Sequence, residues 1–129
     1  MTGYRKTSEL SEVLQLFGWQ IQTRPMLWSP PTDVYETDEA YIVRVEIAGM
    51  REEDFEITLQ DNYLFIQGIR TDTPERRAYH QMEIRFGRFA TIVELPPGVN
   101  TQHIEAEYHN GFLFVTLPKA KPAFLNIQD

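Results

Sequence analysis

The chain has 129 residues, 42% of them hydrophobic and 24% charged, which is enough for one globular domain with one core. Its net charge of -7 opposes phosphate-bearing partners, so we expect neither nucleic acid nor a membrane as a partner. The absence of cysteine excludes disulfides, thiolate nucleophiles and cysteine-based zinc sites. Because no apolar run resembles a signal peptide or a membrane helix, we expect a soluble, cytoplasmic protein.

Residues 1–27 form an apolar N-terminal arm that contains the one segment with helical periodicity. Ser8 is suited to the N-cap and Gly18 to the end of a short amphipathic helix. The apolar stripe of this arm comprises Leu10, Val13, Leu14, Phe17, Trp19 and Ile21. A helix this short is marginal alone in water, so the stripe must bury against its own domain or against another chain.

Residues 28–118 carry short runs in which apolar and polar residues alternate, as in strands with one buried face. The runs are 41–47, 55–60, 64–67, 89–95, 104–108 and 112–117. Asp61-Asn62 and Asn110-Gly111 supply hairpin turns between consecutive runs. Many strands and almost no helix predict an all-β fold, an immunoglobulin-like antiparallel β-sandwich.

Residues 69–85 are long for a structureless connection. Their second half, Ala78 to Ile84, has the composition of a strand, with Tyr79, Met82 and Ile84 as apolar contacts around Glu83. If its own sheet has no room for this strand, it can pair with the edge of a second copy and form a strand-exchanged dimer. The alternative is a disordered loop of mixed charge.

At this point the chain resembles the small heat-shock proteins of the prokaryotic and plant type, which are built on the alpha-crystallin domain. Residues 28–38 look like the start of that domain, and residues 106–113 fit its A-x-x-x-N-G-x-L motif, with Asn110, Gly111 and Leu113 at the defining positions. The sequence Leu125-Asn126-Ile127 resembles the family's C-terminal I-x-I/V motif. Two residues depart from the pattern, because Ile84 and Thr91 stand where many members have arginine.

The resemblance implies an ATP-independent chaperone, or holdase, that binds unfolded or partly unfolded clients and is neither an enzyme nor dependent on a cofactor. The arm would bind clients, and residues 119–129 would form a C-terminal extension whose Leu125 and Ile127 dock on another subunit. Subunits would form a homodimer by strand exchange and a larger homo-oligomer by tail docking. By the same resemblance, the tail would enter a groove formed by Ile57, Leu59, Ile104, Ala106 and Tyr108.

Parts of the sequence are compatible with three functions other than that of a chaperone. A co-chaperone adaptor of the CS-domain type shares the sandwich but needs neither an apolar tail motif nor an exchange loop. A carbohydrate-binding sandwich would gather Tyr35, Tyr41, Tyr63, Phe65 and Phe114 on one sheet face. A metal site is permitted by the spacing of His103, Glu105, Glu107 and His109 on one strand, although a solvated edge strand shows the same pattern.

Overall fold

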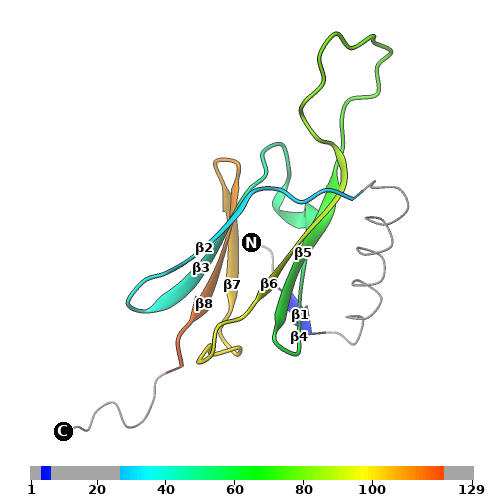
Figure 1. Cartoon of the computed structure of the whole chain (residues 1–129). Helices are drawn as coiled ribbons and strands as arrows, with labels where there is room; N and C mark the ends of the chain where they lie inside the picture. The colour runs from blue at the N-terminus through cyan, green and yellow to red at the C-terminus, as the bar shows by residue number, and fades with distance from the viewer. Residues whose placement is uncertain (1–3, 7–26, 121–129) are drawn as a thin grey trace, which may run out of the picture.

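The computed structural model describes residues 4–6 and 27–120. Two four-stranded sheets pack face to face, with strand orders β1-β4-β5-β6 in sheet A and β2-β3-β8-β7 in sheet B (Figure 1). The elements are β1 (Tyr4–Lys6), β2 (Thr32–Glu36), β3 (Ala40–Glu46), the 3-10 helix η1 (Glu52–Asp54), β4 (Phe55–Gln60), β5 (Tyr63–Arg70), β6 (Gly87–Glu94), β7 (Glu105–His109) and β8 (Phe112–Pro118). The predicted all-β sandwich is confirmed, and β1, which runs parallel to β4, is the exception among antiparallel pairs. The predicted helix from Leu10 to Phe17 lies outside the described residues.

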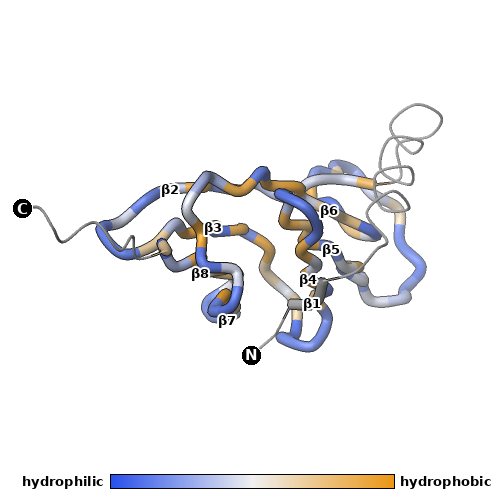
Figure 2. The backbone as a smooth tube through the Cα atoms, turned by 90° about the horizontal axis from the view of Figure 1, so that it is seen from below, coloured by the Kyte–Doolittle hydropathy of each residue, from blue (hydrophilic) through white to orange (hydrophobic). Residues whose placement is uncertain are grey.

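The core lies between the two sheets and follows directly from the alternation in the sequence. Register pairs such as Val43 with Val115 and Leu59 with Leu64 place apolar residues from neighbouring strands on one face. The side chains of these four residues are almost completely buried in a single cluster. Figure 2 shows hydrophobic residues mainly along the strands and hydrophilic residues mainly in the connections between them.

The Asn110-Gly111 turn closes the β7–β8 hairpin as the sequence predicted. Asn110 and Gly111 adopt φ angles of 54° and 80°, the left-handed combination that Asn-Gly tolerates best. The carbonyl of Gly111 accepts a hydrogen bond from the amide of Ile47 at 2.9 Å, and a Cβ on Gly111 would lie 3.4 Å from the Cβ of Ala48. The turn therefore fixes the end of β3 as well as its own hairpin.

Trp28 anchors the start of the sandwich on β6. Its amide donates to the carbonyl of Arg88 at 3.1 Å, and its carbonyl accepts from the amide of Ala90 at 3.0 Å. The indole is only 7% exposed, and its ring centroid lies 5.7 Å from that of Phe89. The chain then crosses to sheet B as β2, so Trp28 belongs to the core of the sandwich and covers part of the edge of β6.

Tyr108 connects β7 to the segment that follows β3. Its hydroxyl donates to the carbonyl of Ile47 at 2.8 Å and accepts from the amide of Met50 at 3.3 Å. Its ring centroid lies 5.1 Å from that of Phe55, at the start of β4. A single half-buried phenol thus links both sheets.

We expect Tyr108→Phe to lower the free energy of unfolding by about 1–2 kcal/mol, because two backbone groups lose their hydroxyl partner. Urea unfolding followed by circular dichroism measures the change. Tyr63→Phe is the matched control, since Tyr63 is 37% exposed and its change should stay within about 0.5 kcal/mol. Equal effects of the two substitutions would contradict the structural role of the Tyr108 hydroxyl.

Candidate functional site

The predicted groove residues lie on β4 and on or beside β7, the predicted dimer strand lies in the connection between β5 and β6, and the hallmark residues lie in the β7–β8 hairpin. The terminal strands are β1 and β6 in sheet A and β2 and β7 in sheet B. Edge strands present backbone N–H and C=O groups that another chain can pair with. The candidate site is therefore a set of interaction surfaces.

The five residues of the predicted groove lie in or against the core cluster. Ile57 and Leu59 lie on β4, Ala106 and Tyr108 lie on β7, and Ile104 directly precedes β7. The four aliphatic side chains are at most 8% exposed and belong to one core cluster, against which Tyr108 packs. They face the interior from two strands of opposite sheets, which contact each other through Phe55 and Tyr108, and the four aliphatic residues are already buried in the single chain.

Strand β1 lies along the edge of β4 beside these residues. It pairs in parallel, with Tyr4 in register with Ile57, Arg5 with Thr58 and Lys6 with Leu59. No sequence pattern predicted this strand, because three residues are too few to show an alternation. The chain's own N-terminal segment therefore occupies the edge at which the tail was expected to dock.

In sheet B, the terminal strand β2 presents an edge with exposed apolar side chains. Val34 is 47% exposed and Tyr35 follows it on the same strand, also exposed. Arg44 holds the outer face of this strand through an ion pair with Asp33 and a contact of 5.2 Å with the Tyr35 ring. The hydrogen bond from Arg44 to Asp33 raises the pKa of the guanidinium.

A long loop, residues 71–86, projects beyond the ends of β5 and β6 (Figure 1). Its apolar residues are displayed to solvent, with Tyr79, Met82 and Ile84 between 49% and 66% exposed. Glu83 lies among them, and residues 78–84 form no strand in the single chain. Pairing with a second copy therefore stays a prediction, for which the loop presents the required apolar residues.

Two clusters shape this loop at its base and within its first half. At the base, the Arg70 guanidinium donates to the carbonyls of Arg85 and Ala48 and lies 4.8 Å from the Trp28 ring centroid. Further along, Asp72 binds the guanidinium of Arg77 at 2.9 Å. The hydrogen bond from the Thr73 amide, followed by the charge of Arg77, lowers the pKa of the Asp72 carboxyl.

The two departures from the family pattern occupy different environments. Thr91 is buried inside sheet A, and its hydroxyl is hydrogen-bonded to that of Thr32, with the two oxygens 3.1 Å apart. This pair joins β6 to the start of β2, where the resemblance placed an arginine. Ile84, in contrast, stands exposed on the long loop.

The C-terminal segment leaves the sandwich from a fixed point. The amide of Lys119 donates to the carbonyl of Glu39 at 3.0 Å, and its ammonium lies 2.7 Å from the Glu36 carboxylate. The hydrogen bond from the Lys119 ammonium to the Glu36 carboxylate raises the pKa of the ammonium. The amide of Ala120 donates to the carbonyl of Gly98 at 2.6 Å. The tail motif, Leu125 and Ile127, lies outside the described residues.

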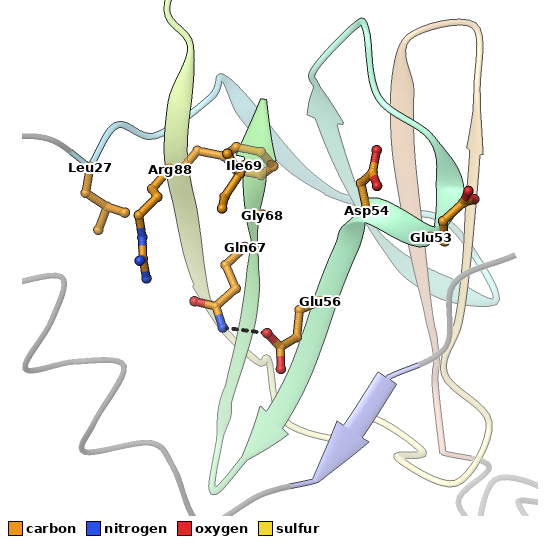
Figure 3. Close-up of a pocket in the computed structure, with 9 residues that line it drawn as sticks. Leu27, Glu53, Asp54, Glu56, Gln67, Gly68, Ile69 and Arg88 are labelled. Atoms are coloured by element: carbon orange, nitrogen blue, oxygen red, sulfur yellow. Dashed lines mark hydrogen bonds between the residues drawn. The ribbon is translucent and has the colours of Figure 1, made fainter. Parts of the chain in front are cut away.

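A pocket of about 460 Å³ lies at one end of sheet A (Figure 3). The Glu56 carboxylate in this pocket accepts a hydrogen bond from the Gln67 amide at 3.3 Å, and Arg51 lies 3.7 Å from the carboxylates of both Glu53 and Asp54. These contacts hold the acidic groups in structural pairs. The pocket is lined by Leu27, Glu53, Asp54, Glu56, Gln67, Gly68, Ile69, Arg88 and Phe89.

The metal alternative fits the structure less well than the solvated-strand alternative. In residues 4–6 and 27–120, no group of three or more His, Cys, Asp or Glu side chains is placed to hold a metal ion. Glu107 and His109 alternate along β7 with the buried Ala106, and the His109 ring stacks on Phe114 at 5.0 Å. This is the polar outer face of an edge strand.

The aromatic residues of the carbohydrate-binding alternative divide between the two sheets. Tyr35 and Phe114 lie on sheet B, whereas Tyr63 and Phe65 lie side by side on β5 of sheet A, with ring centroids 6.4 Å apart. Tyr41 contacts the Lys119 ammonium beside the C-terminal exit. They therefore form no single platform.

Within the described part of the chain, no helix has the length and apolar character to span a membrane.

Comparisons with known proteins agree with this arrangement. Small heat shock protein C2 of Rickettsia felis is 35% identical over 92 residues, which cover 70% of this chain and 60% of the relative. The 18.1 kDa class I heat shock protein of rice, Oryza sativa, is 32% identical over 93 residues, covering 70% of this chain and 58% of the relative. The matched segment thus corresponds to about 60% of the length of these relatives.

The solved structure of heat shock protein 16.0 from Schizosaccharomyces pombe superposes with a TM-score of 0.64 at 32% identity, covering 72% of this chain and 88% of that one. Residues 33–127 match the sequence model of the Hsp20/alpha crystallin family. This match includes all but the first residue of β2, all of β3 to β8, the Asn110-Gly111 turn and the Leu125-Asn126-Ile127 motif. The chain belongs to the Hsp20/alpha crystallin family.

Proposed function

We propose that the protein is an ATP-independent chaperone that binds unfolding proteins and prevents their aggregation, working from a dimer-based oligomer. The observation that carries this proposal is a sandwich with an apolar open edge at β2 and a projecting loop with exposed apolar residues. Surfaces of this kind mark association sites. Family membership supports the chaperone activity, and the adaptor alternative explains neither the loop nor the tail motif.

The proposed division of labour follows three parts of the chain. Residues 1–27 form the client-binding arm, residues 28–118 the sandwich and residues 119–129 the docking tail. The structure adds that residues 4–6 pair with the sandwich as β1, so the arm is attached to the domain near both of its ends.

In the proposed dimer, residues 78–84 of one subunit pair with β2 of the other. Among the described edges, β2 combines a free flank with the exposed side chains of Val34 and Tyr35. The edge of β7 instead shows Glu105, Glu107 and His109, which suit solvent better than an apolar strand. Pairing the loop with β2 would give each subunit the same pair of contacts, as a twofold dimer requires.

Replacing Tyr79, Met82 and Ile84 by serine should convert the dimer into folded monomers, because the exchanged strand loses its apolar contacts. Light scattering after size exclusion gives the mass, and circular dichroism checks the fold. Ile69→Ser is the control, since Ile69 is also exposed but lies in β5, before the loop. Deletion of residues 73–81 should have the same effect, and an intact dimer in both variants would exclude strand exchange.

The tail is proposed to join dimers into larger oligomers. In an extended segment, Leu125 and Ile127 point the same way and can fill two neighbouring sites. Their burial stabilises docking by about 3–6 kcal/mol gross, whereas ordering each tail residue costs about 1–2 kcal/mol. One docked tail therefore contributes little net stability, and an assembly depends on many tails that act together and exchange.

Leu125→Ala combined with Ile127→Ala should reduce the oligomer to dimers and leave the sandwich folded. The control is Asn126→Ala, because residue 126 points away from the docking side of an extended tail. Light scattering at matched protein concentrations measures the mass. An unchanged mass in the double variant would contradict the role of the tail.

Client binding is proposed to reside in the apolar stripe of the arm. Leu10→Ser, Leu14→Ser and Phe17→Ser together, in the full chain, should markedly weaken suppression of light scattering from a heat-unfolding client without nucleotide. Ser11→Ala with Gln15→Ala is the control on the polar side of the stripe. Full protection by the triple variant would place client binding on the domain. If the unmodified chain gives no protection without ATP, the holdase proposal fails and the adaptor alternative replaces it.

A further inference from the structure

We propose that a hydrogen-bonded network of Asp72, Arg77 and Tyr79 pre-orders the long loop, so that residues 80–84 meet a second subunit already extended. This inference rests on the proposed dimer, in which residues 78–84 pair with β2. It deepens that proposal by assigning Asp72 and Arg77 as positioning residues, which act within their own subunit. Tyr79 then acts through its hydroxyl as well as through its ring.

The network is closed by a triangle of contacts around Arg77. Its Nη1 donates to Oδ2 of Asp72 and to the Tyr79 hydroxyl, both at 2.9 Å, and the Tyr79 hydroxyl donates to the same Oδ2 at 3.3 Å. Nη2 of Arg77 donates to the carbonyl and to the hydroxyl of Thr73, both at 3.0 Å. Because the guanidinium is planar and rigid, these bonds fix the two ends of residues 72–79 relative to each other.

The network is partly shielded from solvent, although the loop projects from the sandwich. The side chains of Arg77 and Asp72 are only 28% and 32% exposed, and the guanidinium lies 5.6 Å from the Tyr79 ring centroid. The pKa of the Asp72 carboxyl is lowered first by the Thr73 amide and further by Arg77 and the Tyr79 hydroxyl, as hydrogen bonds to a carboxylate should do. An isolated surface ion pair stabilises little, but this network restrains several residues together.

Residues 80–84 are therefore held at both ends. On one side Tyr79 belongs to the network, and on the other side the carbonyl of Arg85 accepts a hydrogen bond from Nε of Arg70 at 2.9 Å. Ordering a residue costs conformational entropy. Residues that are ordered when the subunit folds do not incur this cost again when two subunits associate.

Within this short segment, the side chains already lie as they do along a strand. The amide of Gln81 donates to the carboxylate of Glu83 at 2.6 Å, and side chains two positions apart lie on the same side of an extended backbone. Met82 and Ile84, which are 63% and 66% exposed, alternate with this pair. The segment thus offers two apolar residues at the spacing that a strand added to β2 requires.

The first test compares Asp72→Asn with Glu75→Gln in the full chain, and sedimentation velocity over a dilution series gives the dissociation constant of the dimer. Both substitutions remove one carboxylate from the loop, but the Glu75 side chain is 64% exposed and lies 3.8 Å from Nε of Arg77. Asp72→Asn should weaken the dimer about tenfold, the factor that corresponds to about one hydrogen bond. Glu75→Gln should change the constant by less than about twofold, and urea unfolding should show an unchanged sandwich in both variants.

The second test separates positioning from direct contact with the partner. Tyr79→Phe keeps the ring and removes the hydroxyl, so a purely apolar role predicts a dimer that is unchanged or tighter. Loss of the network predicts a dimer about threefold to tenfold weaker. Asp72→Asn combined with Arg77→Gln should be no weaker than Asp72→Asn alone, because both residues belong to one network.

Unchanged dissociation constants for Asp72→Asn and Tyr79→Phe would overturn the pre-ordering. If Met82→Ser with Ile84→Ser still separates the subunits, strand exchange itself remains. Additive losses in the Asp72→Asn/Arg77→Gln variant would also contradict a shared network. A dimer that none of these substitutions affects would overturn strand exchange, and the pre-ordering with it.

Discussion

An open β-sandwich leaves its outermost strands with unsatisfied backbone groups, and this constraint organises the molecule. Two four-stranded sheets bury a shared core, but neither sheet closes on itself, so each terminal strand needs a partner or solvent. A long apolar strand with a free flank invites uncontrolled association. In the described residues the four edges differ in whether they are covered, polar or apolar, and these differences separate the surfaces suited to binding from those suited to solvent.

Short segments that precede β2 in the sequence cover the edges of sheet A. Strand β1 pairs with β4, and Trp28 bridges to Phe89 on β6. Sheet B keeps β7 polar through its glutamates and leaves β2 with exposed apolar side chains. Each of these covering contacts involves few residues.

Much of the sandwich could be predicted from the sequence, because burial on one face imposes a period of two. The alternation of Val43 and Val45 predicted β3, and the Asn110-Gly111 pair predicted the β7–β8 hairpin. The five residues of the predicted groove all belong to or pack against one core cluster, since they face the interior from strands of the two opposed sheets. These features depend on local pattern and on one core, which a sequence displays directly.

Other features depend on pairing between distant segments, and no local pattern announces them. Strand β1 has three residues and gains its conformation only from β4. The hydrogen bond between Thr32 and Thr91 joins residues 59 positions apart, so neither residue shows from its neighbours that its hydroxyl is satisfied. The pairing of β1 with the edge of β4 likewise depends on residues more than fifty positions apart, so neither segment announces it alone.

The contacts of Arg70 at the base of the long loop affect the thermodynamics of the proposed strand exchange. Arg70 holds the Arg85 carbonyl and lies against Trp28, so the two ends of the loop are brought together by the subunit itself. The entropy of loop closure is therefore lost during folding of each chain and does not have to be lost again on dimer formation. In the proposed dimer, two subunits that meet would need to order only the tip of the loop, and two that part would leave their cores intact. The barrier to exchange would thereby be separate from the barrier to unfolding.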